Sequence, residues 1–118
     1  VVARQRLTDI YTWYSGEFAY LLERLAGVIE ADGTRLLDNT LIVWGSEIAA
    51  GNTHSWANMP FVLAGGAGGA MRTGRFVTHE GVSHCRLLTT MCRAMGLAEV
   101  DSFGNLDDGS GVLDDLLV

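Results

Sequence analysis

Apolar residues recur at spacings of three and four along the first quarter of the chain. The series consists of Leu7, Ile10, Tyr11, Tyr14, Phe18, Leu21, Leu22, Leu25, Val28 and Ile29. This spacing places the side chains on one face of a helix, and Asp32-Gly33 offers a glycine for the helix C-terminus. The pattern therefore predicts a long helix over residues 4–31. A helix of this length in a short chain is expected to cover one face of a sheet and to supply much of the core.

Two strands are predicted next, at residues 39–45 and 60–64, because each range contains an unbroken apolar run, at residues 41–44 and 60–64. Uninterrupted runs of strand length are typical of strands buried on both faces, as in a parallel sheet covered by helices. Pro60 is tolerated because it opens the second strand. The connection of about 14 residues between the runs has little helical periodicity, which predicts an irregular loop with a functional purpose. The sequence thus predicts an α/β fold with a mostly parallel sheet.

A second helix is predicted over residues 84–95. Ser83 is a suitable N-cap residue, and Gly96 supplies the stop. The inward positions are Leu87, Leu88, Met91, Cys92 and Met95. Before this helix, the segment 72–75 reads as a turn that leads into a short strand at 75–78. With no linker or repeat in the sequence, we expect a single domain over residues 1–118.

Composition and charge narrow the range of partners. Hydrophobic residues make up 48% of the 118 residues, and the net charge is −6. The eight basic residues are all arginine and form no basic stripe, which argues against nucleic-acid binding. No apolar run approaches the roughly 18–20 residues that a membrane span requires, so no membrane span is expected.

The best site candidate is the pair Glu47 and His54. In open parallel sheets, ligands lie beyond the carboxyl ends of the strands. Glu47 follows the first predicted strand, His54 lies in the connection, and Gly65-Gly66 follows the second strand. We therefore expect Glu47 and His54 within about 8 Å of each other, on the same side of the sheet as Gly65-Gly66.

Three interpretations of this pair stay open. A carboxylate and an imidazole are suitable ligands for zinc (Zn) or manganese (Mn), and they are equally an acid–base pair. The third interpretation is a solvated loop histidine beside a glutamate that accepts backbone hydrogen bonds. A metal site needs at least one more protein ligand, and the sequence shows no convincing third residue near Glu47 and His54.

Two other motifs have simpler explanations. The loop Gly65-Gly66-Ala67-Gly68-Gly69 lacks the spacing of a dinucleotide fingerprint, and the chain has no lysine for a phosphate loop. It predicts a tight turn that allows close backbone approach to a neighbour or an anion. His79 and His84 are five residues apart and do not form a zinc motif; they read as a loop histidine and a first-turn helix histidine, with a site role as the alternative.

Several motifs together resemble one known family. They are Trp44-Gly-Ser-Glu47, Gly51-Asn-Thr-His54 and Met59-Pro-Phe-Val-Leu-Ala-Gly65. The combination resembles the C-terminal part of a bacterial family of unknown function that is named for a His-x-x-Ser-His-His motif. The segments 17–25, 87–91 and 103–104 extend the likeness over nearly the whole chain. The naming motif itself would lie upstream of Val1, and the chain opens inside a predicted helix, so we expect a fragment.

The resemblance carries expectations about function. Members of this family resemble the alkaline phosphatase and sulfatase superfamily, whose enzymes hold metal ions at the carboxyl ends of a parallel sheet and cleave phosphate or sulfate esters. The resemblance implies the C-terminal part of a larger exported protein, periplasmic or secreted, in which Glu47 and His54 are partial ligands of a divalent metal.

Because the nucleophile and the remaining ligands would lie in the absent part, this chain by itself is expected to be inactive. The alternative is a non-catalytic binding or surface-associated protein on the same fold. In either case, apolar surface exposed by the truncation is expected to drive formation of a homodimer.

Overall fold

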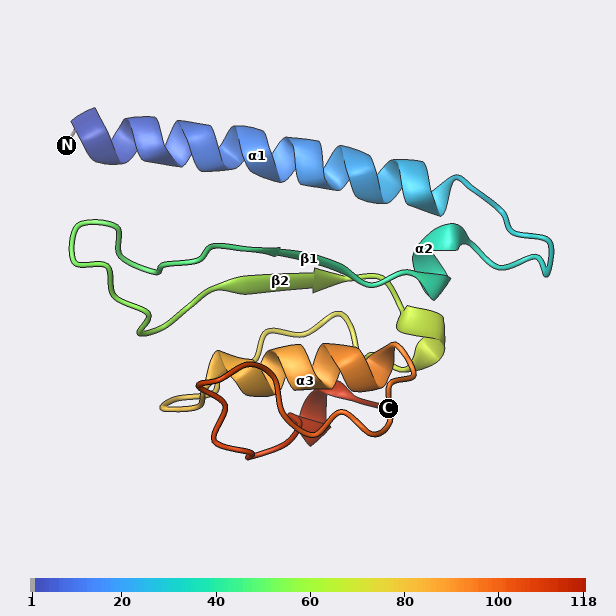
Figure 1. The fold of residues 1–118 in the computed structure, drawn as a ribbon. Helices are drawn as coiled ribbons and strands as arrows, with labels where there is room; N and C mark the ends of the chain where they lie inside the picture. Colours follow the sequence, from blue (N-terminus) through green and yellow to red (C-terminus); the bar gives the residue numbers. More distant parts are fainter. Residues whose placement is uncertain (1) are drawn as a thin grey trace. The chain divides into compact units, whose positions relative to one another are not determined.

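The computed structural model describes residues 2–118 and divides the chain into two compact units, Val1–Leu37 and Asp38–Val118. The first unit contains the long helix α1. The second unit contains two strands and one regular helix (Figure 1). The helices and strands are α1 (Val2–Ala26), α2 (Leu36–Asn39), β1 (Ile42–Gly45), β2 (Phe61–Ala64) and α3 (His84–Ala94), and two short 3-10 turns cover Ala67–Gly69 and Asp114–Leu116.

Helix α1 ends at Ala26, five residues earlier than the pattern predicts. Beyond it, Val28 and Glu30 pair with the returning segment: Leu36 N–H donates to the Val28 carbonyl at 2.9 Å, and Glu30 N–H donates to the Thr34 carbonyl at 2.9 Å. β-Branched residues such as Val28 favour this extended pairing over helix.

Asp32-Gly33 therefore forms the tip of a small hairpin rather than a helix stop. Asp32 Oδ1 accepts hydrogen bonds from the Thr34 hydroxyl at 2.6 Å and from the Thr34 N–H at 2.9 Å. These bonds, the hydroxyl first, lower the pKa of the Asp32 carboxyl below its usual value. Gly33 takes the positive φ of 86° that the turn requires.

The expectation that the long helix supplies much of the core is wrong. No residue of α1 is buried, and the cluster of buried apolar residues contains none of its side chains. Many of its large apolar residues are about half exposed, including Leu7 at 54% and Tyr14 at 51%. Within residues 2–118, no helix combines the length and the apolar character that a membrane crossing needs.

The predicted parallel sheet is also wrong. Strands β1 and β2 form a two-stranded antiparallel sheet in which Ile42 pairs with Ala64 and Gly45 pairs with Phe61. Every strand pairing within residues 2–118, including three isolated bridges, is antiparallel. The chain is therefore not a fragment of an alkaline-phosphatase-like parallel sheet. The physical reason lies in the segment that connects the strands. Two neighbouring parallel strands need a crossover connection, usually a helix, whereas the irregular loop 46–60 returns the chain directly as a wide hairpin.

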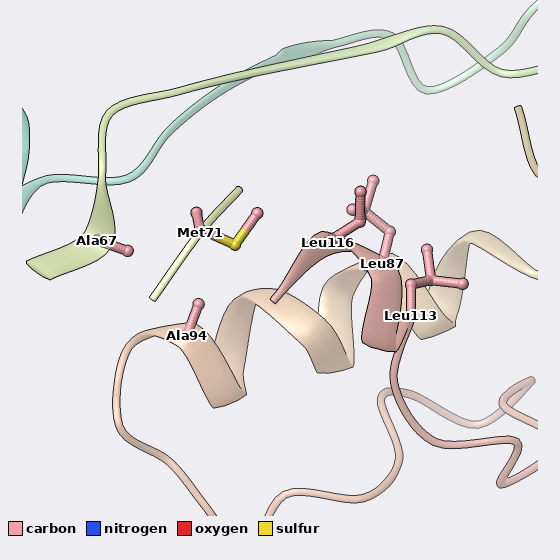
Figure 2. Packing of buried hydrophobic residues seen from close by; sticks show 6 residues of the cluster. All are labelled: Ala67, Met71, Leu87, Ala94, Leu113 and Leu116. Carbon is pink, nitrogen blue, oxygen red and sulfur yellow. The ribbon is translucent and has the colours of Figure 1, made fainter. Parts of the chain in front are cut away.

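The core of the second unit lies between the hairpin and α3 (Figure 2). Its buried members are Ala67, Met71, Leu87, Ala94, Leu113 and Leu116, and Phe61 and Leu63 of β2 pack against them. Helix α3 is confirmed close to its predicted bounds, from His84 to Ala94, with the Ser83 hydroxyl accepting from the Cys85 N–H at 3.2 Å. The inward position predicted for Met95 is wrong, because this residue is 55% exposed, and Thr89 and Thr90 are the fully buried positions. The predicted strand at 75–78 does not form; this segment carries no regular secondary structure.

Candidate ligand-binding pocket

Glu47 and His54 both lie in the loop between β1 and β2, and both are exposed. A small turn organises this loop: Ala49 N–H donates to the Ser55 carbonyl at 2.8 Å, and Ser55 N–H donates to the Ala50 carbonyl at 3.2 Å. His54 closes the turn in the left-handed conformation with φ 52°, which histidine tolerates better than most residues. The predicted irregular loop is thus confirmed, and His54 has a clear local role in its turn.

Gly65-Gly66 lies at the other end of the hairpin, so the prediction that it shares an edge with Glu47 is wrong. The antiparallel register places Gly45, just before Glu47, beside Phe61 at the start of β2. Ala64, just before the glycine loop, pairs instead with Ile42. The rule about the carboxyl ends of parallel strands does not apply to this sheet, because the two carboxyl ends point in opposite directions.

The metal assignment gains no support from other side chains. Among residues 2–118, no three or more histidine, cysteine, aspartate or glutamate side chains gather in a way that could hold a metal ion. Glu47 and His54 are two ligand side chains, fewer than the three or four that zinc sites take from the protein. The described residues do not fit a metal centre, and the role of Glu47 and His54 as partial ligands stays a prediction.

The larger feature of the second unit is a pocket of about 1150 Å³. It lies beside the core, and its lining includes the buried side chains of Met71, Leu87, Leu113 and Leu116. The irregular segment 71–83 forms another part of its lining, together with β2. This volume is slightly above the usual range of small-molecule sites, about 300–1,000 Å³, whose lining is mostly apolar.

Aromatic side chains line the pocket without being buried. Trp56 is 66% exposed and Phe76 is 94% exposed. The Phe61 ring lies near the His84 ring, with 6.3 Å between their centroids and a tilt of 36°. Large exposed aromatics beside an apolar recess are typical of surfaces that bury themselves against a ligand.

Most of the charged and titratable side chains of the lining are basic. Arg72, Arg75, His79 and His84 contribute to it, against a single carboxylate from Glu80. This concentration of basic side chains contrasts with a whole chain of net charge −6. The guanidinium of Arg72 has no hydrogen-bonding or ion-pair partner within the part of the chain that the structure describes. The pocket therefore presents an available positive charge beside an apolar recess.

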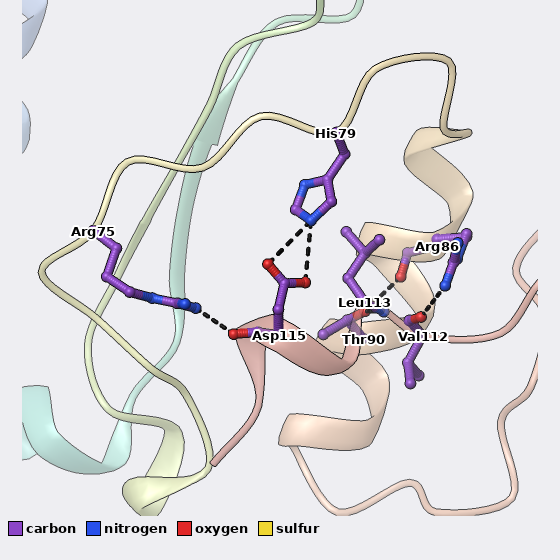
Figure 3. Close-up of polar contacts among 7 residues, drawn as sticks. All are labelled: Arg75, His79, Arg86, Thr90, Val112, Leu113 and Asp115. Carbon is purple, nitrogen blue, oxygen red and sulfur yellow. Dashed lines mark hydrogen bonds and ion pairs between the residues drawn. The ribbon is translucent and has the colours of Figure 1, made fainter.

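Two of these basic residues are held by the C-terminal segment (Figure 3). His79 Nε2 lies 3.1 Å and 3.2 Å from the two carboxylate oxygens of Asp115. The Arg75 guanidinium donates to the backbone carbonyl of the same residue. Asp115 belongs to the turn Asp114–Leu116, whose Leu116 is part of the buried core. The contacts with Asp115 thus tie the irregular segment to the core.

The C-terminal segment is itself anchored on α3. The Thr90 hydroxyl, fully buried, donates to the Arg86 carbonyl at 2.6 Å and accepts from the Leu113 N–H at 2.8 Å. The Arg86 guanidinium donates to the Val112 carbonyl (Figure 3). Because Leu113 and Leu116 line the pocket, these bonds position a part of its lining.

Replacing Thr90 by valine is expected to lower the free energy of unfolding by about 1–2 kcal/mol, because the Leu113 N–H loses its acceptor in a buried place. Thr90→Ser is the matched control, since it keeps the hydroxyl. Urea unfolding followed by circular dichroism measures both; equal losses for valine and serine would show that the hydrogen bond is unimportant.

Sequence reasoning misses the basic residues of the pocket. The local pattern around Arg72 and Arg75 indicates a turn before a strand, and His79 reads as a loop residue with a site role only as the alternative. His79 and Asp115 are 36 residues apart, so no local spacing signals their contact. The one available signal is compositional: Arg72, Arg75, His79 and His84 fall within 13 residues of a chain that is otherwise acidic.

Comparisons with protein-family models, with curated proteins and with solved structures find no match to this chain. The resemblance to the His-x-x-Ser-His-His family therefore stays an expectation that rests on the motifs alone. The fold that it implies is contradicted by the antiparallel pairing of β1 and β2.

Proposed function

We propose that the second unit is a binding module for an organic anion with an apolar body, such as an aromatic carboxylate, sulfonate or phosphate ester. The observation that carries this proposal is the pocket of about 1150 Å³, in which apolar and aromatic lining lies beside four basic side chains. This takes up the non-catalytic alternative from the sequence. The hydrolase interpretation depended on the parallel sheet and its metal ions, and both lack support here.

The charge of the pocket lining favours an anion over a neutral or cationic ligand. Arg72 and Arg75 carry full positive charges, whereas Glu80 is the only acidic residue of the lining. Arg75 is already engaged by the Asp115 carbonyl, so Arg72 is the residue with an available guanidinium. A guanidinium binds carboxylate and phosphate oxygens through two parallel hydrogen bonds, which fixes the orientation of the bound group.

The apolar lining favours a flat or aromatic body on the ligand. Trp56 and Phe76 offer exposed aromatic rings, and the buried residues Leu87, Leu113 and Leu116 provide a recess. A second pocket of about 310 Å³ is lined by Leu41, Leu88, Met91, Cys92, Met95, Leu97 and Phe103. That smaller pocket has no charged group, so a neutral apolar molecule is expected to bind to either pocket. An anion is expected to prefer the larger pocket, and this preference distinguishes the two pockets.

Isothermal titration calorimetry with naphthoate and naphthamide tests the proposal, since the two probes differ little in shape and only one is charged. Naphthoate is expected to bind more tightly. Arg72→Gln is expected to raise its dissociation constant several-fold to about tenfold and to reduce the salt dependence of binding, because a partly exposed charge pair is lost.

Arg4→Gln is the matched control, because it removes the same charge from α1 in the other unit. Equal affinity for the two probes, no binding of either, or an equal loss in Arg4→Gln would each contradict the proposal.

A further inference from the structure

Helix α1 presents an apolar face along its whole length. Its 25 residues include none that is buried. The exposed members of this face are Leu7, Ile10, Tyr11, Tyr14 and Leu21, each between 44% and 60% exposed, and the half-buried Phe18, Leu22 and Leu25 complete it. Helices in water gain most of their stability from packing such a face against a partner. Among its described residues, 2–37, the first unit contains no other long helix and no sheet to cover this face, so the face is an interaction surface of that unit.

The charges of α1 are divided between its two halves. The first half carries Arg4, Arg6 and Asp9, two positive charges and one negative, for a net charge of +1. The second half carries Glu17, Glu23 and Arg24, two negative and one positive, for a net charge of −1. A parallel pair of such helices would place like halves side by side. An antiparallel pair places opposite halves together, and it also aligns the helix dipoles favourably.

One ion pair can be placed along the flank of the apolar face. Arg6 and Glu17 are 11 residues apart, close to three turns at about 3.6 residues per turn, so they share one side of the helix. A two-fold axis near Tyr11 and Thr12 brings each Arg6 opposite the partner's Glu17. The same axis places Tyr11 and Tyr14 near the centre of the contact. Leu7 of one chain then lies opposite the second half of the other chain's α1.

We propose that α1 is a self-association helix that packs antiparallel against α1 of a second copy of this chain. The helix is about 37 Å long at about 1.5 Å per residue. A large side chain offers about 150–250 Å² when it is fully exposed. The five exposed apolar side chains of this face are about half exposed, so together they offer about 500 Å² per chain. With the half-buried neighbours and the flanking residues, the contact approaches the roughly 800 Å² per partner of a standard interface.

A lipid surface is a less suitable partner for this helix. Three arginines are balanced by three acidic residues along α1, so the helix lacks the basic polar face that binds anionic lipids. The self-association surface is confined to the first unit and does not depend on the ligand proposed for the pocket.

The experiment is a charge exchange read by sedimentation velocity from micromolar to submillimolar concentration. The unaltered chain is expected to form a reversible dimer. Arg6→Glu alone places a glutamate opposite the partner's Glu17. Glu17→Arg alone places an arginine opposite the partner's Arg6, so each single variant creates a like-charge contact. Each is expected to raise the dimer dissociation constant about three- to tenfold. The double exchange Arg6→Glu with Glu17→Arg restores both ion pairs and is expected to return the dissociation constant to that of the unaltered chain.

Glu23→Arg is the matched control, because it makes the same charge change on the side of α1 away from the apolar face. It is expected to weaken the dimer less than Glu17→Arg does, and circular dichroism checks that each variant keeps its helix. A monomer at submillimolar concentration would overturn the proposal. So would a double exchange no tighter than the single variants, or binding of α1 to neutral lipid vesicles in place of a second copy.

Discussion

Replacing Leu87 by alanine is expected to lower the free energy of unfolding of the second unit by about 2–5 kcal/mol. Leu87 is 6% exposed and extends from α3 into the cluster that contains Met71, Leu113 and Leu116 (Figure 2). These residues come from segments outside the α-helices and strands, on either side of α3. The substitution therefore removes packing energy and leaves a cavity at the place where three separate segments meet.

Urea unfolding followed by far-ultraviolet circular dichroism measures the loss. Leu97→Ala is the matched control, since Leu97 follows the same helix and is 52% exposed; it is expected to cost well under half as much. If the two leucines gave equal losses, the core of the second unit would lie elsewhere than around Leu87.

Helix α3 can be predicted from the sequence because its signals are local. The N-cap hydroxyl of Ser83, the apolar spacing from Leu87 and the stop at Gly96 all lie within 14 residues. The end of α1 cannot be predicted in the same way. Val28 and Glu30 leave the helix because Thr34 and Leu36 pair with them, and apolar periodicity does not report such pairing.

The direction of strand pairing is the larger error. Both apolar runs do form strands, at Ile42–Gly45 and Phe61–Ala64, close to the predicted positions. A continuous apolar run predicts a strand that is buried on both faces. However, Val62 is 45% exposed and no residue of either strand is fully buried. An apolar run indicates that a segment forms a strand. Whether two strands pair parallel or antiparallel depends on the segment that connects them, and here the loop 46–60 allows an antiparallel hairpin.

The candidate site depends on that direction of pairing. Glu47 and His54 are candidates because parallel strands would bring their carboxyl ends together, and this geometry is absent from the described sheet. The pocket depends instead on contacts between distant segments, such as the contact of His79 with Asp115. Contacts across 36 residues leave no trace in local spacing, so the cluster of basic residues is the one feature of the pocket that the sequence displays.

Replacing Gly66 by alanine is expected to lower the free energy of unfolding of the second unit by about 3 kcal/mol, at the upper end of the usual cost of overpacking. A Cβ at this position would lie 2.5 Å from the backbone carbonyl oxygen of Asp38. The prediction from sequence that the glycine loop allows close backbone approach to a neighbour is thus confirmed at Gly66. Because Ala67 N–H also donates to the Thr40 carbonyl at 3.2 Å, the loop has little freedom to move away.

The conformation of Gly66 does not itself require glycine, because its φ of −92° is open to any residue. The expected loss is therefore a steric effect, and Gly51→Ala separates it from the general effect of adding a methyl group. Gly51 lies in the loop between β1 and β2, and no atom lies within 4 Å of the position of an added methyl group. Its substitution by alanine is therefore expected to change the free energy of unfolding by less than about 0.5 kcal/mol. Thermal or urea unfolding of the two variants decides the matter: if Gly66→Ala were as stable as Gly51→Ala, the backbone of the loop would not approach Asp38 closely in solution.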